Sequence, residues 1–456
     1  GTKKESIAML NWTKYHILEK IKDDRILLWN TFLGKGITLV GNISPICESE
    51  ACGVWSGEDS KAKQILQSNG FLIEKDQYDV EGKLISKMRS ETVYDDSFMS
   101  ITIIPTDTCN FNCIYCYQSD TIHNMSKETA DSIIRMIARK KTLRKLHISW
   151  FGGEPLCNKE IVFYIMEGIN RVCKERGIVL IADMTTNASL LDLPTFIRLY
   201  DLRVLNYQIT IDGCKKTHDV QRPLKSGGSS YDMILKNLRD IRDNAKGRFF
   251  KIGIRTNFTD FVDNQFAVMK DTLEEEFSND SRFYFFFQWV KNWGGNRISG
   301  IMDRLLSDDE AISHYGRWMD QMAQTSVRTG DITLIRPCSG LCVGCRKNSF
   351  IVDTDGSICK CTTGMYDKDY RDRVVIGKIE KNGLYKIDKW KEIDWLSMDA
   401  DQTECEKCAQ YPICLGMPCP YYKIKHKRVI CNKKTDYVCK IILAMEKQGH
   451  IQEIRI

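Results

Sequence analysis

Apolar positions in the middle of the chain form short continuous runs that alternate with stretches of helical, 3.6-residue spacing. The runs predict strands at residues 101–104, 146–150, 179–184, 205–211, 250–254 and 283–288. Helices are expected between them at residues 127–138, 160–173 and 231–241. Strands that are apolar throughout and are separated by helices are typical of a parallel sheet that helices cover. Six such units predict an α/β fold, a partial (β/α)6 barrel similar to a TIM barrel with fewer units.

Two other zones flank this pattern. Before it, short alternations predict two hairpin strands and then a helix, at residues 25–29, 37–40 and 60–67. The charged residues 91–96 are interpreted as a linker. After the barrel pattern, the chain is dense in cysteine and poor in long periodic segments, so a core there would need bound metal. We therefore expect three domains, at residues 1–97, 98–330 and 331–456.

Polar and glycine residues follow the predicted strands of the barrel. A loop with three cysteines comes after the first strand. The next four strands are followed by residues 151–155, 185–187, 211–213 and 255–257. Because the carboxyl ends of parallel strands lie at one rim, where such folds bind ligands, we expect one site there.

Bulk composition excludes several classes of protein. The 456 residues are 43% apolar and 28% charged, and no apolar run approaches the ~18 residues that a membrane span needs. The net charge of +6 is small, and the basic runs at 139–141 and 423–428 come without a signature of nucleic-acid binding. No secretion signal is visible. We expect a cytoplasmic protein that binds neither nucleic acid nor membrane.

Nineteen cysteines are the most unusual feature of the composition. A reducing compartment disfavours disulfides, so this excess indicates metal binding or catalysis. Three cysteines lie within one loop of eight residues, and eleven lie between residues 338 and 439. Five scattered cysteines are interpreted as small buried hydrophobes without a role, namely Cys47, Cys52, Cys157, Cys173 and Cys214.

The three-cysteine loop has the spacing C-x3-C-x2-C, formed by Cys109, Cys113 and Cys116. Three thiolates on one short loop can hold three irons of a [4Fe-4S] cluster, which otherwise takes four cysteines. The fourth iron then keeps an open coordination position. Zinc is the alternative, although structural zinc sites usually close the tetrahedron with a second, distant pair of ligands. The loop therefore favours a cluster with one open iron.

With Tyr115 just before its last cysteine, this loop resembles the signature of the radical S-adenosylmethionine (SAM) superfamily, and residues 152–155 resemble its GGEP motif. The resemblance implies that Cys109, Cys113 and Cys116 hold the catalytic cluster and that SAM chelates the open iron. One electron would split SAM, and the resulting 5′-deoxyadenosyl radical would remove hydrogen from an unactivated C–H bond. Glu154 and its neighbouring backbone would bind the SAM amino group. The implied SAM-binding residues are Gly152, Gly153, Glu154, Pro155, Thr186, Asn187, Asp212 and Arg255.

The C-terminal zone resembles the SPASM extension, which holds two auxiliary [4Fe-4S] clusters in its family. Its first half is matched by the spacing from Cys345 through Gly356 to Cys361, but Cys419 comes one residue later than the second half requires. The resemblance implies a first cluster on Cys342, Cys345, Cys361 and Cys419 and a second on Cys405, Cys408, Cys414 and Cys439. Cys338 and Cys431 stay open as alternative ligands, and a pair of zinc sites as an alternative to the clusters.

Enzymes that combine this signature with SPASM mostly modify peptides or proteins. Residues 1–97 also resemble, at the level of the fold, the winged-helix-like domains that take up the leader of a ribosomally made precursor as an added strand. A structural extension without a partner is the alternative for this zone. Together the resemblances imply a radical SAM peptide maturase that installs a thioether or carbon–carbon cross-link, supplied with electrons by a reductant such as flavodoxin or ferredoxin.

Two other functions stay open. An anaerobic sulfatase-maturating enzyme would share the barrel and the SPASM part. In those enzymes an Asp follows the cysteine that corresponds to Cys361, whereas Thr362 stands at that position here. A non-enzymatic iron–sulfur electron carrier or a zinc-structured binding protein would not need a GGEP segment at the end of a strand.

Overall fold

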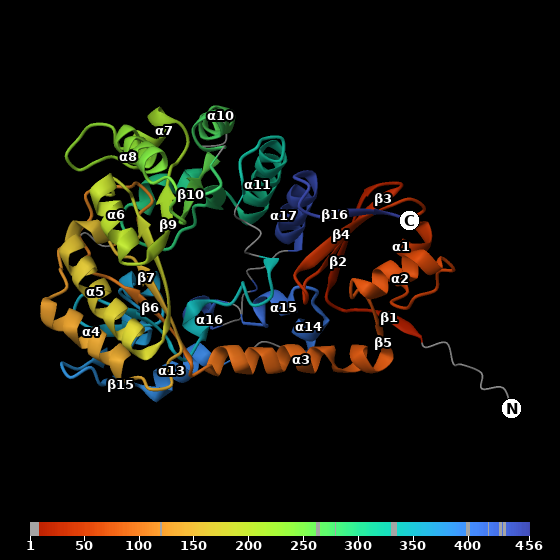
Figure 1. Ribbon diagram of the computed structural model, residues 1–456, viewed down its shortest axis with the longest axis horizontal. Helices are drawn as coiled ribbons and strands as arrows, with labels where there is room; N and C mark the ends of the chain where they lie inside the picture. Colours follow the sequence, from red (N-terminus) through yellow and green to blue (C-terminus); the bar gives the residue numbers. More distant parts are fainter. Residues whose placement is uncertain are drawn as a thin grey trace.

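A ten-stranded sheet forms the centre of the larger part of the molecule, on the left in Figure 1. This computed structural model describes residues 9–118, 121–260, 265–278, 280–329, 335–397, 402–417, 419–427, 431 and 435–456. Six neighbouring strands are parallel, in the order β11-β10-β9-β8-β7-β6. They are Phe98–Ile103 (β6), Lys145–Trp150 (β7), Val179–Thr186 (β8), Val204–Thr210 (β9), Lys251–Phe258 (β10) and Phe283–Trp289 (β11). The predicted strands and the α/β partial barrel are confirmed.

The cysteine-rich zone continues the same sheet. Its strand β12 (Ser349–Val352) pairs in parallel with β6, with Ser349 opposite Ser100. Three antiparallel strands follow, namely Ser357–Cys359 (β13), Val375–Ile379 (β14) and Tyr385–Ile387 (β15). Main-chain hydrogen bonds therefore join the cysteine-rich zone to the first strand of the barrel.

Helices cover the outer face of the barrel, as Figure 1 shows for α4, α5, α6 and α8. In α4 the hydroxyl of Ser126 accepts from the backbone N–H of Thr129 and caps the first turn. The same helix buries Ile133, Met136 and Ile137 against the sheet. The helices are Lys127–Arg139 (α4), Pro155–Asn158 (η1), Lys159–Arg176 (α5), Leu193–Asp201 (α6), Lys215–Gln221 (α7), Ser230–Asn244 (α8) and Phe266–Phe277 (α10).

A second, four-stranded sheet lies at the other end of the molecule, with the order β16-β4-β3-β2. Three of its strands come from the start of the chain, but β16 comes from the far end and pairs in parallel with β4. Leu28 and Ile37 pack toward the small helices beside this sheet, whereas Leu27 and Trp29 pack into the main core. The elements are Leu10–Trp12 (β1), His16–Lys22 (β2), Arg25–Asn30 (β3), Lys35–Val40 (β4), Ser44–Ala51 (α1), Ser60–Ser68 (α2), Leu72–Glu74 (β5) and Gln452–Arg455 (β16).

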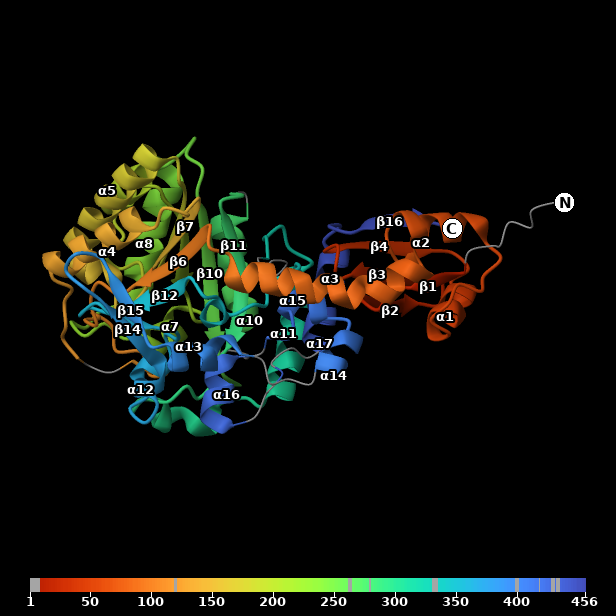
Figure 2. The ribbon, with the colours of Figure 1, turned by 90° about the horizontal axis from the view of Figure 1, so that it is seen from below.

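The helix α3 (Lys75–Tyr94) bridges the two sheets, and Figure 2 shows it running from one part of the molecule to the other. A capping box starts it, in which the side chain of Gln77 accepts from the backbone N–H of Glu74. Of the residues predicted as a linker, 91–94 form the last turn of α3, and 95–96 lead to β6. The apolar face of α3 is weak because Val80 and Leu84 are exposed. The spacing of apolar residues therefore did not predict this helix.

The remaining helices surround the cysteine-rich zone, and α11 packs against α17 between the two sheets. Trp318 of α11 stacks on Phe266 of α10, with ring centroids 4.5 Å apart. Among the described residues, no helix is long and apolar enough to cross a membrane. The helices are Ile298–Arg304 (η2), Asp308–Met322 (α11), Val343–Cys345 (η4), Gly364–Tyr366 (η5), Arg371–Val374 (α12), Lys389–Leu396 (α13), Gln402–Lys407 (α14), Tyr411–Cys414 (α15), Pro420–His426 (α16) and Thr435–Lys447 (α17).

Candidate active site

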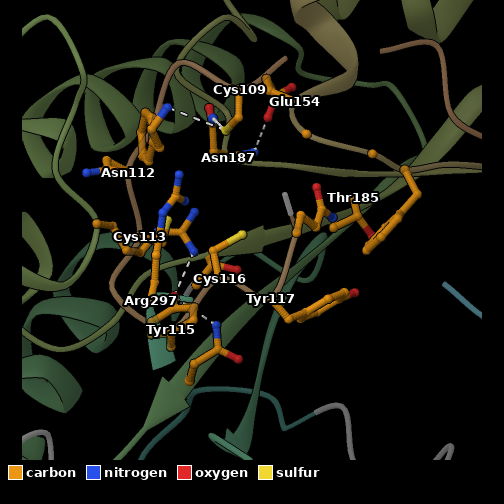
Figure 3. A pocket seen from close by; sticks show the side chains of 18 of the residues that line it. Cys109, Asn112, Cys113, Tyr115, Cys116, Tyr117, Glu154, Thr185, Asn187 and Arg297 are labelled. Carbon is orange, nitrogen blue, oxygen red and sulfur yellow. Dashed lines mark hydrogen bonds between the residues drawn. The ribbon is translucent and has the colours of Figure 1, made fainter. Parts of the chain in front are cut away.

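A cavity of about 1250 Å³ lies at the carboxyl ends of the parallel strands. It is lined by the three-cysteine loop after β6, the GGEP segment after β7 and the ends of β8, β9 and β10. Figure 3 shows Cys109, Cys113 and Cys116 around one space, with Glu154 and Asn187 nearby. The cavity exceeds the roughly 300–1,000 Å³ typical of a site for one small ligand. It therefore has room for a cofactor and part of a second molecule.

Burial makes two of the three loop thiols poor thiolates on their own. It raises the pKa of Cys109 to about 11 and that of Cys113 to about 12. The backbone N–H of Phe111 donates to Sγ of Cys109 at 3.4 Å and favours the thiolate weakly. Metal ions bind the thiolate, so binding there must release protons and offset the cost of burying charge. The donor set, three cysteines on one loop, fits three irons of a [4Fe-4S] cluster.

The two glycines of the GGEP segment allow a close approach to the stretch before Cys109. A Cβ on Gly153 would lie 2.3 Å from the carbonyl oxygen of Asp107 and 2.4 Å from that of Thr108. Gly152 has a φ of +129°, and a Cβ there would lie 2.6 Å from the carbonyl oxygen of Thr106. Both positions thus require glycine. This contact fixes the cysteine loop relative to the end of β7.

Glu154 ties this segment to the end of β8. Its carboxylate accepts from the backbone N–H of Asn187 at 2.6 Å, from the hydroxyl of Thr186 at 2.7 Å and from the backbone N–H of Leu156 at 3.1 Å. The side chain is 1% exposed, and burial raises the pKa of Glu154. The amide of Asn187 also donates to Oδ1 of Asn110 at 2.9 Å, which links β8 to the cysteine loop.

A polar network fixes the hydroxyl group of Tyr115. Its hydroxyl donates to Asp212 and accepts from Arg222 at 3.0 Å and from the amide of Asn257 at 3.1 Å. Asp212 is fully buried and lies behind the cavity wall, whereas Arg255 lines the cavity. Burial lowers the pKa of Arg255. Of these two predicted cofactor-binding residues, Arg255 faces the space directly and Asp212 acts through Tyr115.

Four cysteines predicted for the first auxiliary cluster lie together. The thiol of Cys345 is hydrogen-bonded to that of Cys342 and lowers the pKa of Cys342 to about 7. Burial, together with the nearby Cys342 and Cys419, raises the pKa of Cys361 to about 12. Cys419 also acts on the pKa of Cys345. The backbone N–H of Gly364 donates to Sγ of Cys361 at 3.3 Å, a contact that favours the thiolate. This set of thiols fits an iron–sulfur cluster.

The second set contains one change from the sequence-based assignment. Burial, together with the neighbouring Cys431, Cys408 and Cys405, raises the pKa of Cys414 to about 11. Cys439 lies elsewhere, on α17. Burial raises the pKa of its thiol, which also has a hydrogen bond with Glu19 of β2. Cys431 therefore lies close enough to act on Cys414, whereas Cys439 does not, because α17 packs Cys439 against the N-terminal sheet.

The wall of the cavity after β11 was not predicted from the sequence. It includes Trp289, Lys291, Trp293 and Arg297. Trp289 packs on Tyr437 of α17, which also lines the cavity, with ring centroids 5.6 Å apart. No motif marks these residues, and their only signal is their position after the sixth predicted strand. They place aromatic and cationic groups beside the cysteine loop, because a Cβ on Gly295 would lie 2.8 Å from Cα of Tyr117.

Residues 103–262 match the model of the Radical SAM superfamily. The three-cysteine loop and the GGEP segment, which line the cavity at the rim of this barrel, both lie within the matched residues. A [4Fe-4S] cluster and SAM are the cofactors that the superfamily implies.

Most of the curated relatives match only part of this chain. The radical SAM cyclopropyl synthase TigE of Paramaledivibacter caminithermalis is 20% identical over 216 residues, 43% of this chain and 44% of that protein. The chain spans between 40% and 48% of three such relatives. The cysteine-type anaerobic sulfatase-maturating enzyme of Clostridium novyi is 24% identical over 342 residues, 69% of this chain and 86% of that enzyme.

Two solved structures share the fold. The enzyme anSMEcpe with bound AdoMet covers 77% of this chain and 97% of its own, with a TM-score of 0.58 and 16% identity. SuiB of Streptococcus suis, bound to the precursor peptide SuiA, covers 94% of this chain and 99% of its own, with a TM-score of 0.51 and 15% identity. The likeness to SuiB therefore extends beyond the barrel to both flanking zones.

Proposed function

We propose that this protein is a radical SAM peptide maturase that installs a thioether or carbon–carbon cross-link in a ribosomally made precursor. The observation that supports this most is the likeness to SuiB over 94% of the chain, N-terminal sheet included. That structure contains a precursor peptide. A sequence identity of 15% supports a shared fold but not a shared activity. The reaction is therefore our proposal. We place it in the cytoplasm, with flavodoxin or ferredoxin as the class of electron donor.

Residues of the three-cysteine loop would hold the SAM-binding cluster. When bound, this cluster and SAM together supply a 5′-deoxyadenosyl radical. The residues of this chain would orient and enclose SAM and the cluster. Glu154 holds the GGEP segment to Asn187, and Asp212 with its neighbours fixes Tyr115. Arg255 presents a buried guanidinium to the cavity. A substrate side chain would reach the cavity beside Trp293 and Arg297, which line it.

Two further sets of thiols would hold auxiliary clusters. The first set is Cys342, Cys345, Cys361 and Cys419, and the second is Cys405, Cys408, Cys414 and Cys431. Clusters of this kind, when bound, supply an acceptor or relay for the electron that remains after a new bond forms.

The N-terminal sheet would recruit the leader of the precursor. An extended peptide joins a sheet at an edge strand. Strand β4 is paired on both sides, by β3 and β16, so the edges of this sheet are β2 and β16. We therefore propose these two strands, and not β4, as the place where an added strand would pair.

Formation of formylglycine in a sulfatase is the second candidate. The match to the enzyme of Clostridium novyi spans 86% of that enzyme's length and favours this second function. Thr362 argues against it, because the resemblance assigns an Asp proposed as the base to this position.

Anaerobic incubation of the reconstituted protein with SAM and dithionite tests the proposal. We expect 5′-deoxyadenosine, and, with short precursor-like peptides encoded beside the gene, a product that has lost two hydrogens and contains an internal cross-link. A synthetic sulfatase peptide with the target cysteine is the matched comparison. Conversion of that peptide to formylglycine, without cross-linking of the others, would establish the second candidate instead. Absence of 5′-deoxyadenosine from iron-replete protein would refute both.

A further inference from the structure

A buried lysine lies between the segments that carry the first auxiliary set of cysteines. Lys360 is 1% exposed and directly precedes Cys361. Its Nζ donates to the carbonyl oxygens of Arg346 at 2.6 Å, Ser349 at 3.0 Å and Lys347 at 3.3 Å. An ammonium group has three N–H donors, and here three carbonyl oxygens accept them. The geometry is therefore that of the charged form, satisfied by neutral acceptors.

These contacts connect two parts of the thiol set. The carbonyls belong to the stretch that directly follows Cys345, whereas Lys360 is adjacent to Cys361. A Cβ on Gly344, between Cys342 and Cys345, would lie 2.8 Å from the carbonyl oxygen of Lys360. Side chain and backbone of one residue thus hold both ligand-bearing segments in place.

The ammonium group of Lys360 lies in the same buried region as these thiols, since Lys360 is 1% exposed and Cys345 is fully buried. In the described part of the chain, Lys360 has no ion pair at salt-bridge distance. The buried carboxylate of Glu392 acts on Lys360, but its own ion pair is with Lys389 at 2.8 Å. Neutral carbonyl oxygens do not cancel the charge of the ammonium group. In a buried region of low dielectric constant, that charge therefore acts strongly on nearby groups.

We propose that Lys360 is a positioning residue for the first auxiliary cluster and that its positive charge raises the reduction potential of that cluster. This inference rests on the proposed function, since it assumes a cluster on Cys342, Cys345, Cys361 and Cys419. A cluster becomes more negative when it takes up an electron, so a buried cation stabilises its reduced form. Lys360 would thereby favour transfer of the leftover electron to this cluster and not back toward the substrate.

Redox titration of the reconstituted protein, followed by electron paramagnetic resonance, tests the proposal in the Lys360→Met and Lys360→Arg variants. At a fixed potential we expect the ratio of reduced to oxidised first auxiliary cluster to fall at least tenfold in Lys360→Met, which corresponds to about 59 mV for one electron. Lys360→Arg keeps the charge and should restore the ratio to within threefold. The matched control is Lys386→Met, whose side chain is 91% exposed and should leave the ratio unchanged.

Iron content distinguishes a failure of this inference from a failure of the proposed function on which it rests. A wild-type protein with only about four irons, the content of one [4Fe-4S] cluster, would refute the auxiliary clusters themselves. Full iron content with an unchanged ratio in Lys360→Met would refute the role of Lys360 alone. If Lys360→Met loses the cluster, Glu392→Gln supplies the test, because removal of this buried carboxylate should shift the ratio in the opposite direction. An unchanged ratio in that variant would overturn the electrostatic claim.

Discussion

Glu154 shows how one buried carboxylate can connect two structural elements at the site. Its oxygens already accept from Thr186, Asn187 and Leu156, and an ionised carboxylate has about four acceptor positions. One position is thus left for a donor from SAM. The GGEP motif predicted the contact with SAM from the resemblance, but the structure adds the contacts that hold the β8 end in place.

Replacing Glu154 by Gln should weaken SAM binding. One charge-assisted hydrogen bond is worth roughly 1.5–3 kcal/mol, so the affinity should fall by about 10-fold to 150-fold. Binding of SAM to the anaerobically reconstituted variant measures this. Glu160→Gln is the control, since that side chain is 75% exposed on α5. An unchanged affinity with normal iron content would show that Glu154 only caps the turn.

The two late cysteines should behave differently. Cys431→Ala should lose about four irons, because Cys431 lies with Cys414 and its neighbours and a [4Fe-4S] cluster takes four thiolates. Cys439→Ala should keep its iron, because that thiol is hydrogen-bonded to Glu19 on another part of the chain. Iron and sulfide analysis after reconstitution decides between them, and the opposite pattern would return the ligand role to Cys439.

At the scale of elements, periodicity predicted the barrel strands because each carries a continuous apolar run, as Phe283 to Phe287 does. It failed for α3, whose exposed Val80 and Leu84 interrupt the apolar face. It also failed for β16, since a four-residue strand with the burial pattern of an exposed edge has no periodic signal of its own. Local pattern predicts what an element buries, but not which distant strand it joins.

The site shows the same division. Cys109 and Gly153 were found because short-range spacing carries their chemistry. Trp293 and Arg297 line the same cavity, but only the curvature of the barrel brings their loop there, and nothing in their local sequence signals it. Cys439 fitted the expected order of cysteines, whereas the packing of α17 decides where its thiol lies.

The contact between the GGEP segment and the stretch before the cysteine loop predicts that Gly153→Ala abolishes SAM cleavage. The new methyl group would meet backbone oxygens of Asp107 and Thr108 at under 3 Å, so one loop must move. We expect 5′-deoxyadenosine formation to fall at least 100-fold. Gly300→Ala is the control, because nothing lies within 4 Å of its Cβ. Normal turnover in Gly153→Ala would mean that the two loops can separate without loss of the site.

For the whole molecule, the three thiol sets should be separable. Three [4Fe-4S] clusters require ~12 irons and ~12 sulfides per chain. Replacing Cys109, Cys113 and Cys116 together by Ala should leave about eight irons and abolish 5′-deoxyadenosine, since the other sets lie on different elements. Cys52→Ala, at an exposed thiol, is the control. Ordinary turnover by the triple variant would refute the assignment of the catalytic cluster.

The pairing of β16 with β4 has a consequence for how the chain is made. The ribosome releases β4 about 400 residues before β16, an interval of roughly 20–80 s at common rates of synthesis. During that time one flank of β4 lacks its native partner and is open to pairing with a neighbouring nascent chain. The N-terminal sheet is thus begun about 400 residues before it can be completed. A permuted gene that encodes β16 directly ahead of β2 would remove this delay.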